Sequence, residues 1–177
     1  PLSPTLRAIM LIVAALLGGA IFAGYRRIER TGESGQRLWS VAGYAGSVIA
    51  TLLLFPQHAE RGLAVLAMLA WGDGSATLGG RLIGGPRLPW NREKSLAGFL
   101  CFIAVGLPMT SLVLWGESHN LEATTPGLSL TAAFACGAVA ATAAAIAESV
   151  PSRVNDNVRV GLTAAVTISL CHAMVLV

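Results

Sequence analysis

The chain has 177 residues, of which 54% are hydrophobic and only 12% are charged, and its formal net charge at pH 7 is +3. A soluble domain carries about 25% charged residues, so this composition excludes an ordinary water-soluble enzyme. The small positive charge is typical of loops beside anionic lipid head groups, and we expect membrane lipids rather than nucleic acid as its partners.

Six apolar segments follow one another along the chain. Five lack Asp, Glu, Lys and Arg and approach or reach the roughly 20 residues that cross a bilayer; they are 8–25, 38–56, 96–116, 128–147 and 160–177. The remaining segment, third in order, begins at Gly62. Because an isolated segment satisfies its backbone in lipid only as a helix, the sequence predicts an all-α polytopic membrane protein with about six transmembrane helices. We expect residues 1–177 to form a single integral membrane catalytic domain, which lacks an upstream N-terminal segment if the opening PLSP marks a removed start.

The basic residues predict how the segments are oriented. Ten of the twelve Lys and Arg residues fall in three stretches, 26–37, 81–94 and 153–159, whereas Arg7 and Arg61 fall on the other side. Loops rich in Lys and Arg tend to stay in the cytoplasm. We therefore expect a multi-pass protein with these three connections on the cytoplasmic side and both termini outside.

The third segment contains WGDGSATLGGRLIGG, residues 71–85, which places one aspartate and six glycines where hydrocarbon should continue. A carboxylate at this depth is costly unless it faces water, a cation or a donor. Glycine weakens a helix, and non-helical backbone at depth occurs only where it lines a cavity. We therefore expect the third helix to break at this motif and to open a polar pocket at Asp73. The alternative is a glycine-rich helix contact in which Asp73 pairs with an arginine such as Arg81.

Two further polar stretches lie on the same predicted side of the membrane. NREKS, residues 91–95, precedes the fourth span, and ESVPSRVNDN, residues 148–157, follows the fifth. Carboxylates that bind Mg²⁺, beside cations and glycine N–H groups that bind phosphate, are the components of phosphoryl or nucleotidyl transfer. The GxxxxGK[ST] phosphate loop is absent, since no glycine stands before Lys94. The sequence therefore favours a nucleotide-dependent membrane enzyme whose site is assembled from three loops.

Three blocks of residues resemble the CTP-dependent lipid-alcohol kinases, the group that contains phytol, farnesol and dolichol kinases. The blocks are GDGSATLGGR (72–81), LPWNREKSLAG (88–98) and ESVPSRVNDNVRV (148–160), and the spacing inside each is kept. The resemblance is strongest with the phytol and farnesol kinase branch. One position departs from the family pattern: a second acid usually stands four residues after Asp73, and this chain has Thr77 there.

The resemblance implies a kinase that transfers the γ-phosphate of CTP to the hydroxyl of a long-chain isoprenoid alcohol, with Mg²⁺ as the cofactor and its site at the cytoplasmic face. The implied catalytic residues are Asp73, Lys94 and Asp156. The implied nucleotide-binding residues are Gly72, Gly74, Gly80, Arg81, Asn91, Ser95 and Asn157. The implied metal ligands are Asp73, Glu148, Asp156 and Thr77. Either Asp73 or Asp156 would take the hydroxyl proton, and Asn157 would either contact the nucleoside or stabilise a turn.

Two other functions use the same residues. A CTP-dependent diacylglycerol kinase or a phosphatidate cytidylyltransferase would need the same metal and nucleotide groups. A small membrane transporter would also use a broken helix with an acid at mid-span. The transporter alternative predicts polar residues on both sides of the membrane, whereas the expected external loops are short and offer few groups that could bind a substrate.

Overall fold

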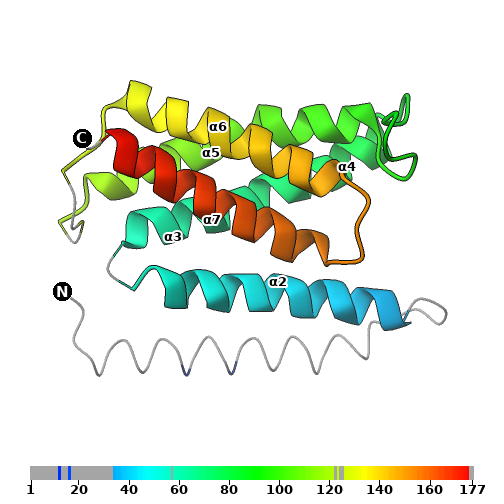
Figure 1. Ribbon diagram of the computed structural model, residues 1–177, viewed down its shortest axis with the longest axis horizontal. Coiled ribbons are helices and arrows are strands. Elements are labelled where there is room, and N and C mark those ends of the chain that lie inside the picture. Colours follow the sequence, from blue (N-terminus) through cyan, green and yellow to red (C-terminus); the bar gives the residue numbers. More distant parts are fainter. Residues whose placement is uncertain are drawn as a thin grey trace.

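The computed structural model describes residues 34–56, 58–121, 123 and 126–175, together with Ile12 and Leu16. This part of the chain is almost entirely helical (Figure 1). Its elements are α2 (Ser34–Leu54), α3 (Ala59–Ala67), the π-helical turn η1 (Met68–Asp73), α4 (Gly74–Leu82), α5 (Leu96–Ser118), α6 (Leu130–Ser149) and α7 (Asp156–Val175). Within the same residues, β pairing is limited to a single bridge between Arg87 and Ser95. The predicted all-α class is therefore confirmed.

Three of the described helices, α5, α6 and α7, are long and apolar enough to cross a membrane. They coincide with the predicted spans 96–116, 128–147 and 160–177. The predicted span 38–56 is a helix, α2, and the predicted first span, 8–25, lies outside the described residues except for Ile12 and Leu16. The structure thus supports a membrane protein with three candidate spans, and the number of six stays a prediction.

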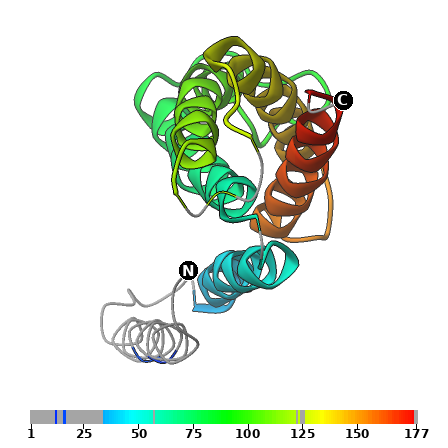
Figure 2. The same cartoon turned by 90° about the vertical axis from the view of Figure 1, so that its left-hand side faces the viewer.

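The helices from α3 to α7 form a ring when the molecule is viewed along their axes (Figure 2). The rod made by α3, η1 and α4 packs against α5, α5 packs against α6, and α6 packs against α7, which returns to contact α3 and η1. Helix α2 lies outside this ring, mainly against α7. Buried alanines fill much of the interface between α6 and its neighbours, because small residues let helices approach closely in a membrane.

The glycine-rich motif does not break the third helix, contrary to our prediction. The chain stays helical from Ala59 to Leu82, and the residues that flank η1 have helical φ and ψ angles. The glycines permit close packing on α5 instead: a Cβ on Gly72 would lie 2.9 Å from Cε1 of Phe102, and a Cβ on Gly79 would collide with a cysteine sulfur of α5. The irregularity that does occur is the π-helical turn that ends at Asp73, and such turns are frequent at functional sites.

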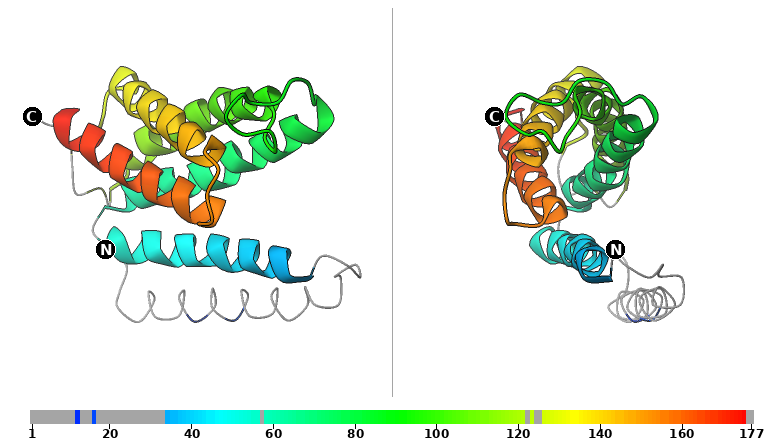
Figure 3. Two further views of the ribbon diagram at one scale, coloured as in Figure 1. Left: turned by 45° about the vertical axis from the view of Figure 1, so that its right-hand side comes forward. Right: turned by 90° about the vertical axis from the view of Figure 1, so that its right-hand side faces the viewer.

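The chain reverses direction just after α4. Gly84 and Gly85 have φ angles of +67° and +86°, a region that glycine adopts without steric cost. The loop 83–95 starts here and returns the chain to the beginning of α5. Together with the 150–155 connection it lies at one end of the bundle (Figure 1), and it crosses the end of α6 (Figure 3). The predicted polar stretches 91–95 and 148–157 therefore lie at the same end of the bundle as the glycine-rich stretch, 71–85.

Candidate active site

The loop 83–95 has a defined shape because its backbone groups bond to one another. The N–H of Leu88 donates to the carbonyl of Lys94 over 3.0 Å, and the N–H of Lys94 donates to the carbonyl of Asn91 over 3.2 Å. The N–H of Leu96 donates to the carbonyl of Pro86 over 2.9 Å. The Leu88 side chain is buried beneath the loop. These contacts hold Lys94 at a fixed position just before α5.

Side chains attach the same loop to the helices. The Asn91 amide donates to the carbonyl of Ser149 over 3.0 Å, and the Trp90 indole N–H donates to the Ser149 hydroxyl over 3.1 Å. The hydroxyl of Ser95 caps α5 by accepting a hydrogen bond from the N–H of Gly98 over 3.1 Å, which satisfies one of the free N–H groups at the start of that helix. Asn91 and Ser95, predicted to bind nucleotide, therefore already have structural partners.

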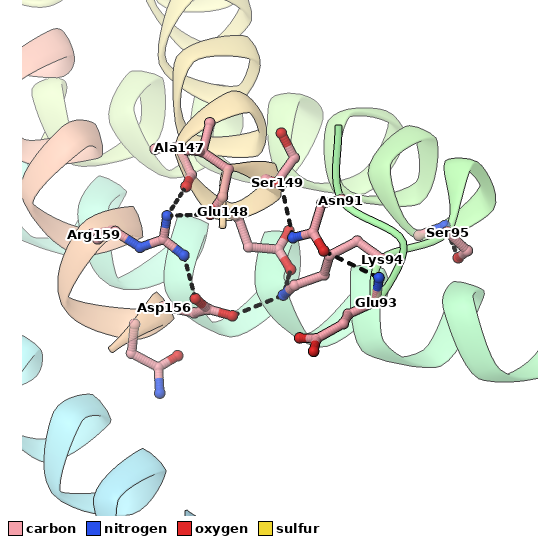
Figure 4. Close-up of polar contacts among 12 residues, drawn as sticks. Asn91, Glu93, Lys94, Ser95, Ala147, Glu148, Ser149, Asp156 and Arg159 are labelled. Carbon is pink, nitrogen blue, oxygen red and sulfur yellow. Dashed lines mark hydrogen bonds and ion pairs between the residues drawn. The ribbon is translucent and has the colours of Figure 1, made fainter. Parts of the chain in front are cut away.

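Lys94 is the centre of a charged cluster that joins three elements (Figure 4). Its Nζ lies 2.6 Å from Oε1 of Glu148, at the end of α6, and 2.8 Å from Oδ2 of Asp156, at the start of α7. Arg159 pairs with the other oxygen of Asp156. We call Lys94, Glu148, Asp156 and Arg159 the Lys94 cluster. Glu148 and Asp156, which are 54 and 62 positions away from Lys94 in the sequence, thus present two carboxylates to one ammonium group.

The electrostatics of the cluster favour the charged form of Lys94. Burial by itself would lower the pKa of this ammonium group, but the carboxylates of Glu148 and Asp156 outweigh burial and hold the pKa of Lys94 above its ordinary value. Opposite charges at such short distances stabilise the ionised form. Lys94 is therefore a permanent cation at neutral pH.

Arg159 was not among the residues predicted for the site. Its guanidinium group donates from Nη1 to the carbonyls of Ala147 and Val150, each over 2.7 Å, and from Nη2 to Asp156. The sequence did contain one signal, since Asp156 and Arg159 are three residues apart and therefore neighbours on a helix surface. The carbonyl partners at the end of α6 could not be predicted from spacing.

Asp73 lies near the Lys94 cluster without joining it directly. Its side chain is half-buried at the end of η1, and it interacts electrostatically with Glu148, Lys94 and Asp156. Among the described residues, none forms a hydrogen bond or ion pair with the Asp73 carboxylate. The two acids thus differ in their partners. Asp156 forms ion pairs with Lys94 and Arg159, whereas Asp73 forms no ion pair with the described residues.

A cavity of about 480 Å³ opens beside the cluster, between α4, the loop 83–95 and the end of α6. Three cations line it: Arg81 from α4, and Arg87 and Lys94 from the loop. Thr77, Gly80, Ser95 and Glu148 also line it. A cavity lined by three cations and glycine backbone suits a multiply charged anion such as a triphosphate. Arg87 was missed in the sequence because nothing in its neighbourhood marks it apart from other loop arginines.

A second hollow of about 370 Å³ lies on the other side of Lys94, and Trp90, Asp156 and Arg159 help to line it. Asn91 also lines this second hollow. The other predicted site residues, which line neither space, are Asp73, Gly72, Gly74 and Asn157. Gly72 packs against Phe102, and the space around a Cβ on Gly74 is open among the described residues. Asn157 lies in the first turn of α7, where its N–H donates to the side chain of Asn155 over 2.9 Å.

The described residues contain no group of three His, Cys, Asp or Glu side chains arranged to hold a metal ion. Of the predicted metal ligands, Glu148 and Asp156 converge on Lys94, while Asp73 and the exposed Thr77 belong to η1 and α4. A divalent cation bound here would therefore be coordinated partly by protein carboxylates and partly by a bound small molecule.

The fold and the cluster define a helical membrane protein with a cation-lined cavity at one end of its bundle. Curated proteins similar to it include a farnesol kinase of Arabidopsis thaliana, 27% identical over 156 residues, which cover 85% of this chain and 49% of that kinase. Phytol kinase 1 of the same plant is 26% identical over 145 residues, covering 77% and 45% of the two chains. A probable phytol kinase of Zea mays is 27% identical over 111 residues, covering 63% and 37%.

These matches confirm the resemblance predicted from the three sequence blocks, so the chain is phytol/farnesol kinase-like in sequence. The chain spans between about a third and a half of the length of these relatives. No protein-family model and no solved structure matches it.

Proposed function

We propose that this protein is a CTP-dependent kinase that transfers the γ-phosphate to the hydroxyl of a long-chain isoprenoid alcohol of the phytol, farnesol or polyprenol type. The observation that carries the proposal is the convergence of Lys94, Glu148 and Asp156 beside a cavity lined by Arg81 and Arg87, in a membrane helical bundle. The similarity to proteins named phytol and farnesol kinases supports the acceptor class.

The nucleotide would place its triphosphate in the cavity of about 480 Å³. Arg81, Arg87 and Lys94 would neutralise phosphate oxygens there, and the nearby backbone of Gly80 would allow close approach because it carries no side chain. Phosphoryl transfer depends mainly on such positioning and charge stabilisation. The cations of the predicted cytoplasmic loops also agree with a site at the cytoplasmic face.

The donor set fits Mg²⁺. Glu148 and Asp156 present carboxylate oxygens to the same ammonium group, within 2.6 and 2.8 Å of Lys94 Nζ, and nucleotide-bound Mg²⁺ is usually held by one or two carboxylates together with phosphate oxygens. These two carboxylates would hold the ion, with Thr77 as a further ligand from the predicted set. When bound, Mg²⁺ neutralises part of the triphosphate charge.

The reaction needs one proton acceptor. A bond forms between the alcohol oxygen and the γ-phosphorus, the bond from that phosphorus to the β–γ bridging oxygen breaks, and CDP leaves. Asp156 pairs with Lys94 and Arg159, and a carboxylate held by two cations is a weak base. Asp73 has no such partner in the described part of the chain. We therefore assign the alcohol proton to Asp73.

The alcohol would reach Asp73 from the membrane. Trp71, Leu78 and Leu82 are 52%, 61% and 82% exposed, and their spacing of seven and four residues places them on one face of the η1–α4 rod. An exposed apolar face on a membrane helix contacts lipid. The isoprenoid chain would lie along this face. Asp73 is two residues from Trp71 and therefore points to another side of the rod, so the hydroxyl would pass around the rod to reach the half-buried carboxylate.

The test is a transfer assay with the purified full chain in lipid nanodiscs and Mg²⁺. CTP labelled at the γ-phosphate is incubated with phytol, farnesol, undecaprenol or diacylglycerol, and label is expected in the isoprenoid alcohols. CTP labelled at the α-phosphate should leave no label in lipid. Lipid labelling from the α-phosphate would identify a cytidylyltransferase, and γ-labelling confined to diacylglycerol would identify a diacylglycerol kinase; either result rejects the proposal.

Asp73→Asn tests the assignment of the proton acceptor. We expect kcat to fall by about 10²-fold or more, as is typical when a general base is lost, with little change in CTP affinity measured by calorimetry. The matched control is Glu117→Gln, an acid at the C-terminal end of α5, whereas the cavity lies at the start of that helix. This variant should keep full activity. Retention of kcat in Asp73→Asn would exclude Asp73 as the base.

A further inference from the structure

We propose that Arg159 is a positioning residue that holds Asp156 opposite Lys94 and Glu148. The inference rests on the proposed function, because it assigns Arg159 a role in the same site. Arg159 lies in the first turn of α7, its side chain is 15% exposed, and it does not line the main cavity. Its effect on that cavity must therefore pass through the groups it bonds, which are Asp156 and the C-terminal end of α6.

The first part of the argument is how Arg159 is anchored. Nη1 donates to the carbonyls of Ala147 and Val150, each over 2.7 Å. Both carbonyls belong to the C-terminal end of α6, where helix carbonyls lack intrahelical partners and carry partial negative charge. They also flank Glu148 in the sequence. The guanidinium group is thus fastened to the segment that carries the first carboxylate of the cluster.

The second part is what Arg159 holds. Its Nη2 donates to Oδ1 of Asp156, while Oδ2 of the same carboxylate faces Lys94 at 2.8 Å (Figure 4). Both oxygens of Asp156 are therefore constrained, one by each cation. A carboxylate held on one oxygen alone could rotate away from Lys94, whereas this one has a single orientation.

Together these contacts link two helices through one side chain. Glu148 is at the end of α6 and Asp156 at the start of α7, and a six-residue connection, 150–155, separates the helices. Arg159 bridges the α6 carbonyls and the α7 carboxylate, so it sets the separation of the two acids that meet at Lys94. The planar guanidinium fork can make these contacts at once, whereas the compact ammonium group of lysine cannot.

The kinetic experiment compares Arg159→Gln and Arg159→Lys with wild type in the CTP transfer assay. We expect both variants to lower kcat about 10- to 100-fold and to leave KM for CTP within about threefold, because Arg159 does not contact the cavity. The control is Arg153→Gln, an exposed arginine of the 150–155 connection that lines neither hollow, and its kcat should match wild type. Activities are normalised to folded protein measured by thermal unfolding.

Three results would overturn the inference. Full kcat in Arg159→Lys would show that charge alone suffices, a raised KM at constant kcat would show direct nucleotide binding, and unchanged kcat per folded molecule would show a structural role only. If wild type transfers no phosphate to any alcohol, the proposed function fails instead.

A second measurement tests the placement without turnover. Lys94 is the only lysine in the chain, so an amine-acylating reagent reports on this side chain, with labelling located by peptide mass spectrometry. If Arg159 holds Asp156 against Lys94, Arg159→Gln and Arg159→Lys free Asp156 to rotate away from Lys94 Nζ, so the amine becomes more accessible to the reagent and its acylation rate rises. Arg153→Gln should label as wild type does. Equal rates in all four proteins would refute the positioning role even in an inactive enzyme.

Discussion

The two ends of the helical bundle both carry charged residues, but among the described residues cations line the cavity at one end and not the hollow at the other. Opposite the Lys94 cluster, Arg61 Nε donates to Nδ1 of His172 over 2.9 Å, and His58 lies 3.2 Å from Glu60. We call these four residues the His172 cluster. His172 and Glu60 are 0% and 1% exposed, so this cluster connects α3 to α7 inside the protein.

The spaces beside the two clusters differ in charge. The hollow near the His172 cluster has a volume of about 340 Å³, and the described residues that line it include Glu60 and Glu117 but neither Lys nor Arg. The cavity near the Lys94 cluster is lined by three cations. A triphosphate needs cations that face the space it occupies. The comparison therefore teaches that buried ion pairs alone do not make a phosphate site.

The largest effect should separate the two ends directly. Lys94→Ala removes a cation from the cavity and leaves two carboxylates without their shared partner, so we expect kcat/KM for CTP to fall by about 10³-fold or more. Arg61→Ala removes the partner of buried His172, so we expect a lower unfolding temperature with activity per folded molecule within about twofold of wild type. Comparable losses of activity in the two variants would show that the two ends of the bundle do not differ in their importance for activity.

The cavity arginines should show an intermediate effect. Arg81→Ala and Arg87→Ala each remove one charge that faces the triphosphate, so we expect KM for CTP to rise about tenfold, the loss typical of one charge-assisted hydrogen bond, while kcat changes little. Steady-state kinetics with varied CTP give both constants. Arg153→Ala, at the same end but away from the cavity, provides the control. An unchanged KM in both cavity variants would mean that the triphosphate binds elsewhere.

The smallest effect concerns stability at the two ends. A Cβ on Gly79 would collide with Cys101, whereas nothing described lies within 4 Å of a Cβ on Gly116 near the other end of α5. Gly79→Ala should therefore destabilise the protein by about 1–3 kcal/mol through overpacking. Gly116→Ala should be neutral or stabilising by up to about 1 kcal/mol, because alanine favours helix. Thermal unfolding of both variants measures the difference, and equal unfolding temperatures would contradict the packing role of Gly79.

Much of the fold could be predicted because hydrocarbon imposes a simple rule on the backbone. The charge-free runs predicted α5, α6 and α7 closely, since a long apolar segment has no stable alternative to a helix in lipid. The glycine motif was the exception. Glycine both weakens a helix and permits close helix contact, and only the presence of Phe102 and Cys101 opposite Gly72 and Gly79 decides between the two outcomes.

The candidate site, like the fold, could be predicted from the sequence only in part. The sequence alone determined which chemical groups are present and that three polar stretches carry them, because motif spacing and composition are local properties of the chain. The tertiary structure decided that Glu148 and Asp156 share Lys94, that Asp73 stands apart from them, and that Arg87 and Arg159 belong to the site. Those outcomes depend on where helix ends meet and how the loop 83–95 folds back, and contacts between distant segments are not encoded in any single stretch of residues.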